Sequence, residues 1–539
     1  MKRLATFAFA LCAAFTMSQA QSLSPSTKTH WEKGTLVVET PQRPAGQQSA
    51  LGLTVPAMKT VRVGFVGLGM RGPWAVMRFA NIPGVQIVAL CDFEEKRAEG
   101  CQKYLREKGL PPAEIYSGAK GYEELCKRND IDLVYVATDW NHHFPVAMCA
   151  MENGKNAAIE VPSAMNLEQC WALINMSEKT RKHCMVLENC CYDYYEMNAL
   201  NMAQKGVFGE ILRAEGAYIH NLDDFWEAYW MDPDDKDTGK LHWRMKYNME
   251  NRGDVYATHG LGPVAQCLDI HRGDRFTVLT AMDTKSVHGK EWVKKKTGKD
   301  VDFRNGDHTT TLMRTANGKV VEIQHNVMTP QPYNRLFKLT GTKGYATKYP
   351  EEHFALDASA LKEAKGAPNM DDLSSHGFMN AKQQEELVKA YYHPILAKYG
   401  ELGREMGHGG MDFIMDSRLV YCLQNGLPLD MDVYDMAEWC CLAELGTLSM
   451  DNNCCAVSFP DFTRGDWNKV SGYRHAYANA DQEAAQEAAA KASTEAQKQI
   501  TTKLKLWDLY DAKKDGNAKA VKAYQKAMAK AQAALKKSL

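Results

Sequence analysis

Short apolar runs alternate with amphipathic stretches along residues 59–188 of this 539-residue chain. The runs 61–66 and 85–92 are rich in Val, Leu and Ala, and a helical pattern lies between them from about Pro73 to Ile82. Two further runs, in "IDLVYVATDW" and "NAAIEVP", repeat this alternation. Strands that alternate with helices pair in parallel. This part of the chain therefore predicts an α/β fold with a doubly wound parallel sheet.

Longer runs of alternating polar and apolar positions follow from residue 189 onward. In "DHTTTLMRTANGKVVEIQHNV", Asn317-Gly318 separates two such runs, which is the strongest local signal for a two-residue β-hairpin. "RLFKLTGTKGYATKY" adds another strand and a glycine turn. We expect an α+β domain with an open, mostly antiparallel sheet, completed by helices whose pattern runs from about residue 383 to 446.

The segment beyond Asn479 consists mainly of Ala, Lys, Gln and Glu, with a sparse apolar stripe that includes Leu504, Trp507 and Tyr510. This composition predicts one or two surface helices, and a helical hairpin would break at Asp515-Gly516. A solvated appendage without chemistry is the simplest interpretation of such a segment.

Export is predicted by the first twenty residues. Met1-Lys2-Arg3 precedes an apolar run from Leu4 to Met17 and a few small polar residues, which is the order of a secretory signal. We expect cleavage after Ala20 and a periplasmic or secreted protein. No later run reaches the roughly 20 apolar residues of a membrane-spanning helix, so no membrane span is expected.

Charge and cysteine content narrow the classes of partner. A formal charge of -1 and a pI near 7.0 offer no electrostatic field that would collect nucleic acid or an anionic membrane. A small neutral substrate is compatible with that charge, and a homo-oligomer remains open. Cleavage of the signal would remove Cys12 and leave 14 of the 15 cysteines, for which buried free thiols and one or two disulfides are both compatible with export.

A glycine-rich turn joins the first strand to the first helix. In a β-α-β unit Gly67 permits the tight turn, Gly69 lets the backbone approach a pyrophosphate, and the helix N-terminus supplies unpaired N–H donors. Asp92 ends the second strand about 20 residues later, where a carboxylate accepts a hydrogen bond from a ribose hydroxyl. A glycine turn without a ligand would not need this acid. A dinucleotide-binding Rossmann domain is predicted, with NAD favoured over NADP because no Arg directly follows Asp92.

Two further turns are predicted to face the same cofactor. The strand in "IDLVYVATDWNHH" delivers residues 138–143 to the carboxyl edge of the sheet, and the strand in "NAAIEVP" delivers Glu160 there. Ligands of doubly wound sheets bind outside that edge. Val161 follows Glu160 at a position where a charged base would make chemical sense. The predicted site therefore has to work without a charge at this position.

These blocks resemble one known family. "VRVGFVGLGMRG", "VALCDFEEKRAE", "DLVYVATDWNHHFPVAMCAMENGKNAAIEVPSA" and "LTGTKGYA" are similar, in order and spacing, to the Gfo/Idh/MocA oxidoreductases over about Lys59 to Phe462. Usual members carry Glu-Lys-Pro with the lysine at the active site. This chain has Glu160-Val161-Pro162, which argues against alcohol dehydrogenation by that lysine.

Within that family, four motifs are similar to bacterial glycoside hydrolases of family 109, which are NAD-using α-N-acetylgalactosaminidases. The motifs are Met70-Arg71-Gly72, Trp140 to His143, Glu160-Val161-Pro162 and Tyr256 to His259. The resemblance implies NAD as cofactor and a glycan with a terminal N-acetylgalactosamine as substrate. It implies NAD contacts at Met70, Arg71, Asp92, Trp140, Asn141, His142, His143, Glu160, Val161 and Asn189. It implies sugar contacts at Tyr218, Arg244, Tyr256, Ala257, Thr258, His259 and Tyr333.

A redox-neutral cycle suits an exported enzyme, which meets almost no free NAD. Oxidation of the sugar at C3 makes the C2 proton acidic, a base removes that proton, and the group at C1 is eliminated. Water then adds, and the hydride returns to C3. Glycosidases that use NAD are exceptions to the two-carboxylate rule.

His259, Tyr256 and Tyr218 are the predicted catalytic residues, with Asp254 in reserve as acid or base. Imidazole moves protons readily near neutral pH. Tyr256 and His259 are three residues apart, so they share one face if a helix begins there.

Other functions remain open from the sequence. An exported NAD(P)-dependent sugar oxidoreductase or epimerase would use the same oxidation without bond cleavage, and a noncatalytic sugar-binding protein would keep NAD as a structural element. No metal site is predicted, because His142 and His143 are adjacent rather than at zinc spacing. The expected organisation is a signal peptide (1–20), an N-terminal tail (21–58), a Rossmann domain (59–188), a substrate-binding α+β domain (189–465) and a helical C-terminal extension (466–539).

Overall fold

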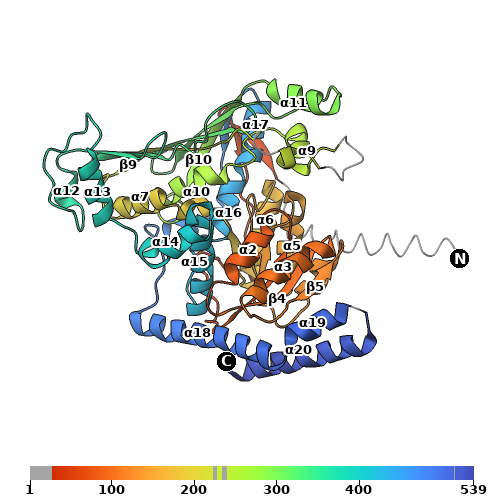
Figure 1. The fold of residues 1–539 in the computed structure, drawn as a ribbon. Coiled ribbons are helices and arrows are strands. Elements are labelled where there is room, and N and C mark those ends of the chain that lie inside the picture. Colours follow the sequence, from red (N-terminus) through yellow and green to blue (C-terminus); the bar gives the residue numbers. More distant parts are fainter. Residues whose placement is uncertain (1–26, 223–226, 233–239, 515, 539) are drawn as a thin grey trace.

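The computed structural model describes residues 27–222, 227–232, 240–514 and 516–538. Figure 1 shows a broad sheet across the top of the molecule, a second sheet wrapped by helices below it, and a group of C-terminal helices along the bottom. The predicted signal peptide lies outside the described residues. Within those ranges, no helix is long and apolar enough to cross a lipid bilayer. The 14 cysteines there are all free thiols.

The first domain contains a six-stranded parallel sheet, as the alternation of runs predicted. Its strands lie in the order β5 (Glu114–Ser117), β4 (Val85–Asp92), β3 (Val61–Val66), β6 (Leu133–Val136), β7 (Asn156–Ile159) and β8 (Cys184–Val186). The central strands are buried along nearly their whole length, because helices cover both faces of the sheet. The chain reverses its direction of winding between β3 and β6, which is where doubly wound sheets bind ligands.

Five helices connect these strands: α2 (Gly72–Phe79), α3 (Glu95–Glu107), α4 (Gly121–Cys126), α5 (Trp140–Glu152) and α6 (Leu167–Thr180). Local chemistry explains where they begin. Pro73 lies in the first turn of α2, where its missing N–H has no intrahelical partner to lose. The Asp139 side chain caps α5 by accepting a hydrogen bond from the backbone N–H of Asn141. Both helices therefore start at the carboxyl edge of the sheet.

The second domain is built on a ten-stranded open sheet. Its order is β1 (Thr29–Glu32), β2 (Thr35–Val38), β16 (Ala456–Ser458), β10 (Phe276–Asp283), β11 (Thr309–Thr315), β12 (Val320–Asn326), β9 (Ile211–Ile219), β13 (Lys338–Gly341), β14 (Gly344–Thr347) and β15 (His353–Leu356). All pairs are antiparallel except β16 with β2 and β12 with β9. The predicted mostly antiparallel sheet is confirmed.

The β11–β12 connection is longer than the two-residue loop predicted from Asn317-Gly318. Residues 316–319 join the strands, and the backbone N–H of Gly318 donates to the carbonyl of Thr315 at 3.1 Å. Gly318 takes the left-handed conformation with φ 85°, while the backbone N–H of Asn317 donates to Asp274 at 3.1 Å. This tertiary hydrogen bond favours the longer turn over the local two-residue preference.

Residues 189–468 also form helices, of which α10 (Thr258–Cys267) and α17 (Leu442–Asp451) pack on the large sheet. The helices are η1 (Asn189–Tyr192), α7 (Tyr194–Gln204), α8 (Glu227–Trp230), α9 (Trp243–Glu250), α10 (Thr258–Cys267), α11 (His288–Thr297), α12 (Ala360–Glu363), α13 (Ala381–Ala390), α14 (Pro394–Glu405), η2 (His408–Gly410), α15 (Met411–Asn425), α16 (Val433–Cys440), α17 (Leu442–Asp451) and η3 (Asp466–Asn468). A Cβ on Gly216 of β9 would lie 2.1 Å from the carbonyl oxygen of Gly260, so α10 packs directly on the sheet backbone. The fully buried α15 contacts the Rossmann domain, where Arg78 binds Asp416 at 2.6 Å.

Residues 27–58 belong to the second domain, which corrects the prediction of an irregular N-terminal tail. β2 pairs with β16, some 420 residues later in the chain. The backbone N–H of Ala50 donates to the hydroxyl of Tyr434 at 2.9 Å, and Leu53 and Val55 are buried. The sequence could not show this, because the pairing is non-local and the segment has little periodicity of its own.

The C-terminal helices are α18 (Ala480–Lys503), α19 (Leu506–Lys514) and α20 (Ala518–Ser538). They lie along the Rossmann domain in Figure 1. Gln497 donates to the carbonyl of Val85 at 2.9 Å, and Trp507 donates to that of Leu110 at 3.0 Å. The chain breaks between α19 and α20 next to Gly516, as predicted. The extension is therefore a packed layer of the first domain.

Candidate active site

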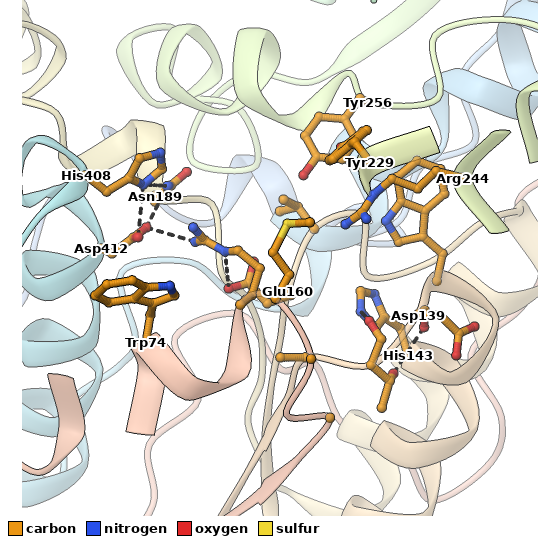
Figure 2. A pocket seen from close by; sticks show the side chains of 18 of the residues that line it. Trp74, Asp139, His143, Glu160, Asn189, Tyr229, Arg244, Tyr256, His408 and Asp412 are labelled. Carbon is orange, nitrogen blue, oxygen red and sulfur yellow. Dashed lines mark hydrogen bonds and ion pairs between the residues drawn. The ribbon is translucent and has the colours of Figure 1, made fainter. Parts of the chain in front are cut away.

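A cavity of about 1420 Å³ opens at the carboxyl edge of the Rossmann sheet and continues beneath the second domain. Figure 2 shows Glu160 near its middle, Asp412 and Asn189 on one side, and Tyr256, Tyr229 and Arg244 on the other. The Rossmann part of the lining contains the glycine turn, Asp92 and the turns after β6 and β7. The other part is mainly aromatic and basic. This volume exceeds that of a pocket for one drug-sized ligand, so it has room for a dinucleotide and a second molecule.

The glycine turn has the shape that a pyrophosphate requires. Gly67 has φ 92°, and a Cβ there would lie 2.4 Å from the backbone of Ala137 and Thr138. A Cβ on Gly72 would lie 2.0 Å from the carbonyl oxygen of Gly67. At Gly69, by contrast, the nearest atom to an added Cβ is Nη1 of Arg97 at 3.8 Å. The fold itself therefore does not need glycine at position 69, whereas a ligand that approaches the backbone does.

The carboxylate of Asp92 holds the glycine turn in place through hydrogen bonds to the backbone. Its Oδ2 accepts from the backbone N–H of Leu68 at 2.6 Å, and its Oδ1 accepts from that of Glu94 at 3.0 Å. The carboxylate also lines the cavity, and its Oδ1 lies 3.6 Å from Nη1 of Arg97. Its position is thus compatible with the predicted ribose contact.

The turns after β6 and β7 are tied together by His143. Nδ1 of this buried imidazole lies 2.8 Å from the carbonyl oxygen of Pro162, and Nε2 lies 3.1 Å from that of Thr138. Burial lowers the pKa of His143, so the neutral ring is favoured. Trp140, His142 and His143 line the cavity, but Asn141 does not. The side chain of Asn141 is exposed, and its NAD contact stays a prediction.

Arg71 connects Glu160 to α15, a helix that the sequence did not assign to the site. Its Nε lies 3.2 Å from Glu160 and its Nη2 lies 3.0 Å from Oδ1 of Asp412. The same Oδ1 accepts from the amide of Asn189 at 2.6 Å, and Nδ1 of His408 lies 2.9 Å from Oδ2. Burial would raise the pKa of Asp412, but Arg71 and its neighbours hold it well below the usual range. These ion pairs orient the cavity wall around Glu160 (Figure 2).

His408 and Asp412 belong to "GHGGMD", a glycine-rich segment 247 or more residues beyond Glu160. The only local sequence signal that could have pointed to these two residues was the concentration of glycine beside a histidine and an acid. Met70 lines the cavity with an exposed side chain, and Val161 lines it beside Glu160 while nearly buried. The position that carries lysine in usual relatives is therefore an apolar patch of the wall.

Tyr218, Tyr256 and His259 converge at the other end of the cavity. Their ring centroids are 4.7 Å apart for Tyr218 and Tyr256, 5.2 Å for Tyr218 and His259, and 4.8 Å for Tyr256 and His259. Tyr218 comes from β9 and His259 from α10, whereas Tyr256 lies in the turn just before α10 rather than within the helix. Burial raises the pKa of both tyrosine hydroxyls well above the usual range, which keeps them protonated as hydrogen-bond donors.

Arg244 of α9 forms the basic part of this end. Its guanidinium carbon lies 4.1 Å from the ring centre of Tyr229 and 4.2 Å from that of Trp243. The Nε atom of Arg244 is buried and has no hydrogen-bond partner among the described residues. Such a donor at a cavity wall is suited to a polar ligand. Tyr333 also lines the cavity, with its ring 4.8 Å from that of His220.

Besides Asn141, three residues named from the sequence lie outside the lining. Ala257 and Thr258 are buried at 4% and 1% exposure, because the start of α10 turns their side chains into the protein core. The structure therefore does not bring these two side chains into the cavity lining, and the sugar contacts there stay predictions. Asp254, the reserve acid or base, is also buried, and its Oδ1 accepts from the backbone N–H of Tyr256 at 3.2 Å. Asp254 supports the turn that carries Tyr256.

A buried ion cluster borders the cavity next to Tyr333. Nζ of Lys348 lies 2.7 Å from Asp193 and 2.7 Å from Glu196, and Arg335 also bonds Asp193. Burial would raise the pKa of Asp193, but Lys348 and Arg335 lower it to about 2. The sequence did not reveal this cluster, because its members come from separate elements.

One group of metal-ligand side chains occurs among the described residues, formed by Glu188, Cys190 and His259 with ligand atoms within 4.8 Å of one another. Burial raises the pKa of Cys190 well above the usual range, which favours the thiol over the thiolate that binds metals. Glu188 and His259 are hydrogen-bonded to each other. These three groups therefore have a structural explanation without an ion.

The fold and the cavity define a two-domain protein of the NAD-dependent oxidoreductase class. Residues 61–188 match the oxidoreductase family with an NAD-binding Rossmann fold, and residues 192–469 match the C-terminal domain of glycosyl hydrolase 109. The chain belongs to glycoside hydrolase family 109. It is thus a glycoside hydrolase with NAD as cofactor and a glycan as substrate.

The relatives support this assignment along the whole chain. The chain is 71% identical to glycosyl hydrolase family 109 protein 3 of Phocaeicola vulgatus, over 97% of this chain and 96% of that protein. It is 57% identical to glycosyl hydrolase family 109 protein 1 of Bacteroides thetaiotaomicron, over 84% of this chain and 95% of that protein. Among solved structures, levoglucosan dehydrogenase in complex with NADH and L-sorbose has a TM-score of 0.56 at 19% identity, covering 75% of this chain and 100% of that one. That similarity shows the fold alone.

Proposed function

We propose that the protein is an exported α-N-acetylgalactosaminidase that removes terminal N-acetylgalactosamine from glycans in a redox-neutral, NAD-dependent cycle. The observation that carries the proposal is the arrangement of the cavity. A group of proton-transfer side chains, Tyr218, Tyr256 and His259, shares one cavity with the glycine turn. The apolar Val161 occupies the position that a dehydrogenase of this family would give to lysine.

Residues on both sides of the cavity would hold the cofactor. The backbone of the turn at Gly69 is open for the pyrophosphate, Asp92 faces the ribose, and Met70, Trp140 and Glu160 line the way to the second domain. Bound NAD supplies a hydride acceptor for C3 of the sugar, and a ketone at C3 makes the neighbouring C2–H acidic.

His259 suits the role of base for the C2 proton. Its Nδ1 is engaged by Glu188, which leaves Nε2 to accept a proton from a ligand in the cavity. The protonated hydroxyls of Tyr218 and Tyr256 would donate hydrogen bonds to sugar oxygens, where negative charge develops during enolisation. Arg244, with its unpaired Nε, would bind a polar substituent of the sugar.

Nitrophenyl glycosides given to purified protein without added NAD test this proposal. We expect hydrolysis of the α-N-acetylgalactosaminide and slower or no hydrolysis of the β-anomer and of the α-galactoside. Hydrolysis in heavy water should place deuterium at C2 of the released sugar, because a base that has taken the C2 proton exchanges it with solvent. Cleavage without deuterium at C2 would overturn the mechanism. Deuterium or epimer formation without cleavage would favour a sugar epimerase.

A matched pair of variants assigns the chemistry to the cavity. His259→Ala should abolish most turnover, whereas His271→Ala removes a buried histidine that binds Glu438 outside the cavity. Equal losses in both variants would indicate a general effect on folding. Export is tested separately by cell fractionation and by N-terminal sequencing, with Gln21 expected as the first residue of the mature chain.

A further inference from the structure

Glu188 lies directly beneath His259, at the point where β8 ends and η1 begins. Its side chain has no exposed surface. Oε1 lies 2.7 Å and Oε2 lies 2.9 Å from Nδ1 of His259, and Oε1 also accepts from the backbone N–H of Cys190 at 3.0 Å. Both carboxylate oxygens therefore face the same imidazole nitrogen.

The sequence of α10 makes room for this carboxylate. Gly262 follows His259 by three residues and so lies on the same face of the helix. A Cβ on Gly262 would lie 3.0 Å from Cγ of Glu188, 3.1 Å from the Trp439 ring and 3.2 Å from the sulfur of Cys191. Any larger residue would press on the carboxylate. Glycine at 262 thus lets Glu188 approach the imidazole from inside the protein.

Glu188 carries its charge although it is buried. Burial alone would raise its pKa, but His259 and the Cys190 N–H outweigh that effect and hold the pKa below the usual range. No other acidic side chain lies within hydrogen-bond distance of His259 among the described residues. His259 is also the only ion-pair partner of Glu188 among the described residues.

We propose that Glu188 is a positioning residue that sets the tautomer of His259. It accepts a hydrogen bond from Nδ1–H, so that Nε2 carries the lone pair toward the cavity. When Nε2 takes the substrate proton, the Nδ1 proton stays in place and the ionised Glu188 stabilises the imidazolium. This inference rests on the proposed role of His259 as base.

Glu188→Gln tests the charge with little change in shape. We expect kcat to fall on the order of 10²-fold or more, as for other residues that orient a catalytic histidine, while KM changes little. The acidic limb of the kcat/KM profile should move to lower pH, because removal of the adjacent negative charge makes protonation of the ring less favourable. Glu188→Asp keeps the charge, so its acidic limb should stay near that of the wild type.

Glu438→Gln is the matched control. Glu438 and His271 form another buried glutamate–histidine pair, with Oε2 and Nε2 3.2 Å apart, but neither residue lines the cavity. The acidic limb of the kcat/KM profile of Glu438→Gln should not move. A shift of equal size in Glu438→Gln, or an unchanged profile in Glu188→Gln, would overturn the proposal.

Histidine ¹⁵N NMR separates this inference from the proposed function. His259, assigned by comparison with His259→Ala, should show a proton on Nδ1 and an unprotonated Nε2 in the resting wild-type protein. A proton on Nε2 alone would overturn the inference even if the enzyme is active. The expected tautomer in a protein that cleaves no N-acetylgalactosaminide would support the inference and contradict only the proposed substrate.

A second inference concerns charge on the surface of α20. Lys519, Lys522, Lys526 and Lys530 are spaced by three and four residues, so they share one helix face, and all are exposed. They span roughly 16 Å along the helix axis. Residues 516–539 contain six lysines and no acidic residue, although the whole chain has a net charge of -1. Positive charge is thus concentrated on this helix.

The opposite face of α20 packs against the protein through Tyr524, Ala531 and Leu535, which are buried. Of the described residues beyond Tyr477, none presents an exposed large apolar side chain. An amphipathic helix that inserts into a lipid surface needs such side chains. Successive lysines of this line are about 4.5–6 Å apart along the helix axis, so an extended anionic polymer can contact several of them at once.

We infer that this lysine stripe binds an extended anionic polysaccharide, apart from the catalytic cavity. The triple variant Lys522→Glu, Lys526→Glu, Lys530→Glu should lose binding to immobilised dextran sulfate, while neutral dextran binds neither protein. The affinity of the wild type should fall steeply with salt, as for any polyanion held by several lysines. Hydrolysis of a small nitrophenyl glycoside should be unchanged.

The matched control reverses the charge of three lysines on another exposed helix by substitution with Glu. These are Lys290, Lys294 and Lys295 of α11. Lys290 and Lys294 are already paired with Asp302 and Asp300. This control should retain dextran sulfate binding. Equal losses in both variants, or no binding by the wild type at low salt, would overturn the inference. Binding to phosphatidylglycerol vesicles but not to dextran sulfate would overturn it in favour of a lipid partner.

Discussion

Gly69→Ala separates cofactor binding from folding more sharply than any other change in the glycine turn. The added Cβ would meet no protein atom closer than 3.8 Å, and Gly69 does not have a positive φ. Such a change in an exposed position alters the free energy of unfolding by no more than about 0.5 kcal/mol. The same methyl group would stand where the pyrophosphate has to approach the backbone.

The loss of affinity follows from the contacts at stake. Displacement of one charge-assisted hydrogen bond between a backbone N–H and a phosphate costs about 1.5–3 kcal/mol. That cost corresponds to a roughly 10- to 150-fold weaker binding of NAD. Gly67→Ala is the contrasting variant. Its Cβ would lie 2.4 Å from the backbone of Ala137 and Thr138 with φ at 92°, so it should destabilise the fold by about 1–3 kcal/mol or more.

Two measurements check this prediction. Nucleotide released on denaturation and titration of nucleotide-free protein with NAD report the affinity, and urea denaturation of the nucleotide-free protein reports the stability. Gly69→Ala should be as stable as the nucleotide-free wild type and should carry little NAD. The reasoning would be refuted if Gly69→Ala bound NAD within twofold of the wild type, or if it lost as much stability as Gly67→Ala.

Three further predictions address the cofactor, the chemistry and pH. Asp92→Ala should weaken NAD binding by about 1.5–3 kcal/mol, since it removes a charge and frees the Leu68 N–H; unchanged affinity in a titration would contradict a role at the ribose. His259→Ala and Tyr256→Phe should each lower kcat on the order of 10²–10⁴-fold in the glycoside assay while retaining bound NAD. Burial raises the pKa of Asp254 to about 7, above its value in the unfolded chain. The contribution of Asp254 to the free energy of unfolding is therefore complete near pH 4 and is lost as the pH rises to 7. Asp254→Asn should therefore flatten the fall in unfolding free energy between about pH 4 and pH 7, and an equal fall in the wild type and the variant, measured by urea titrations, would contradict this.

Features that depend on neighbouring residues could be predicted from the sequence. The parallel sheet followed from the alternation of apolar runs with helical patterns, because that period is set by local backbone geometry. The roles of Gly67 and Gly69 followed in the same way, since a tight turn and a close backbone approach are properties of a few consecutive residues. Tyr256 and His259 could be paired because they are three residues apart.

The tertiary structure alone decided which side chains complete the cavity. Asp412 reaches Arg71 from 341 residues away, and Glu188 reaches His259 from 71 residues away. No local pattern encodes such contacts, because they depend on how α15 and α10 pack against the Rossmann domain. Asn141 and Thr258 show the converse, since they lie within cavity-lining motifs but their helices turn them elsewhere. The sequence determined the elements and the chemistry they carry, and long-range packing determined which of those groups meet, because the burial that holds them together exists only in the folded chain.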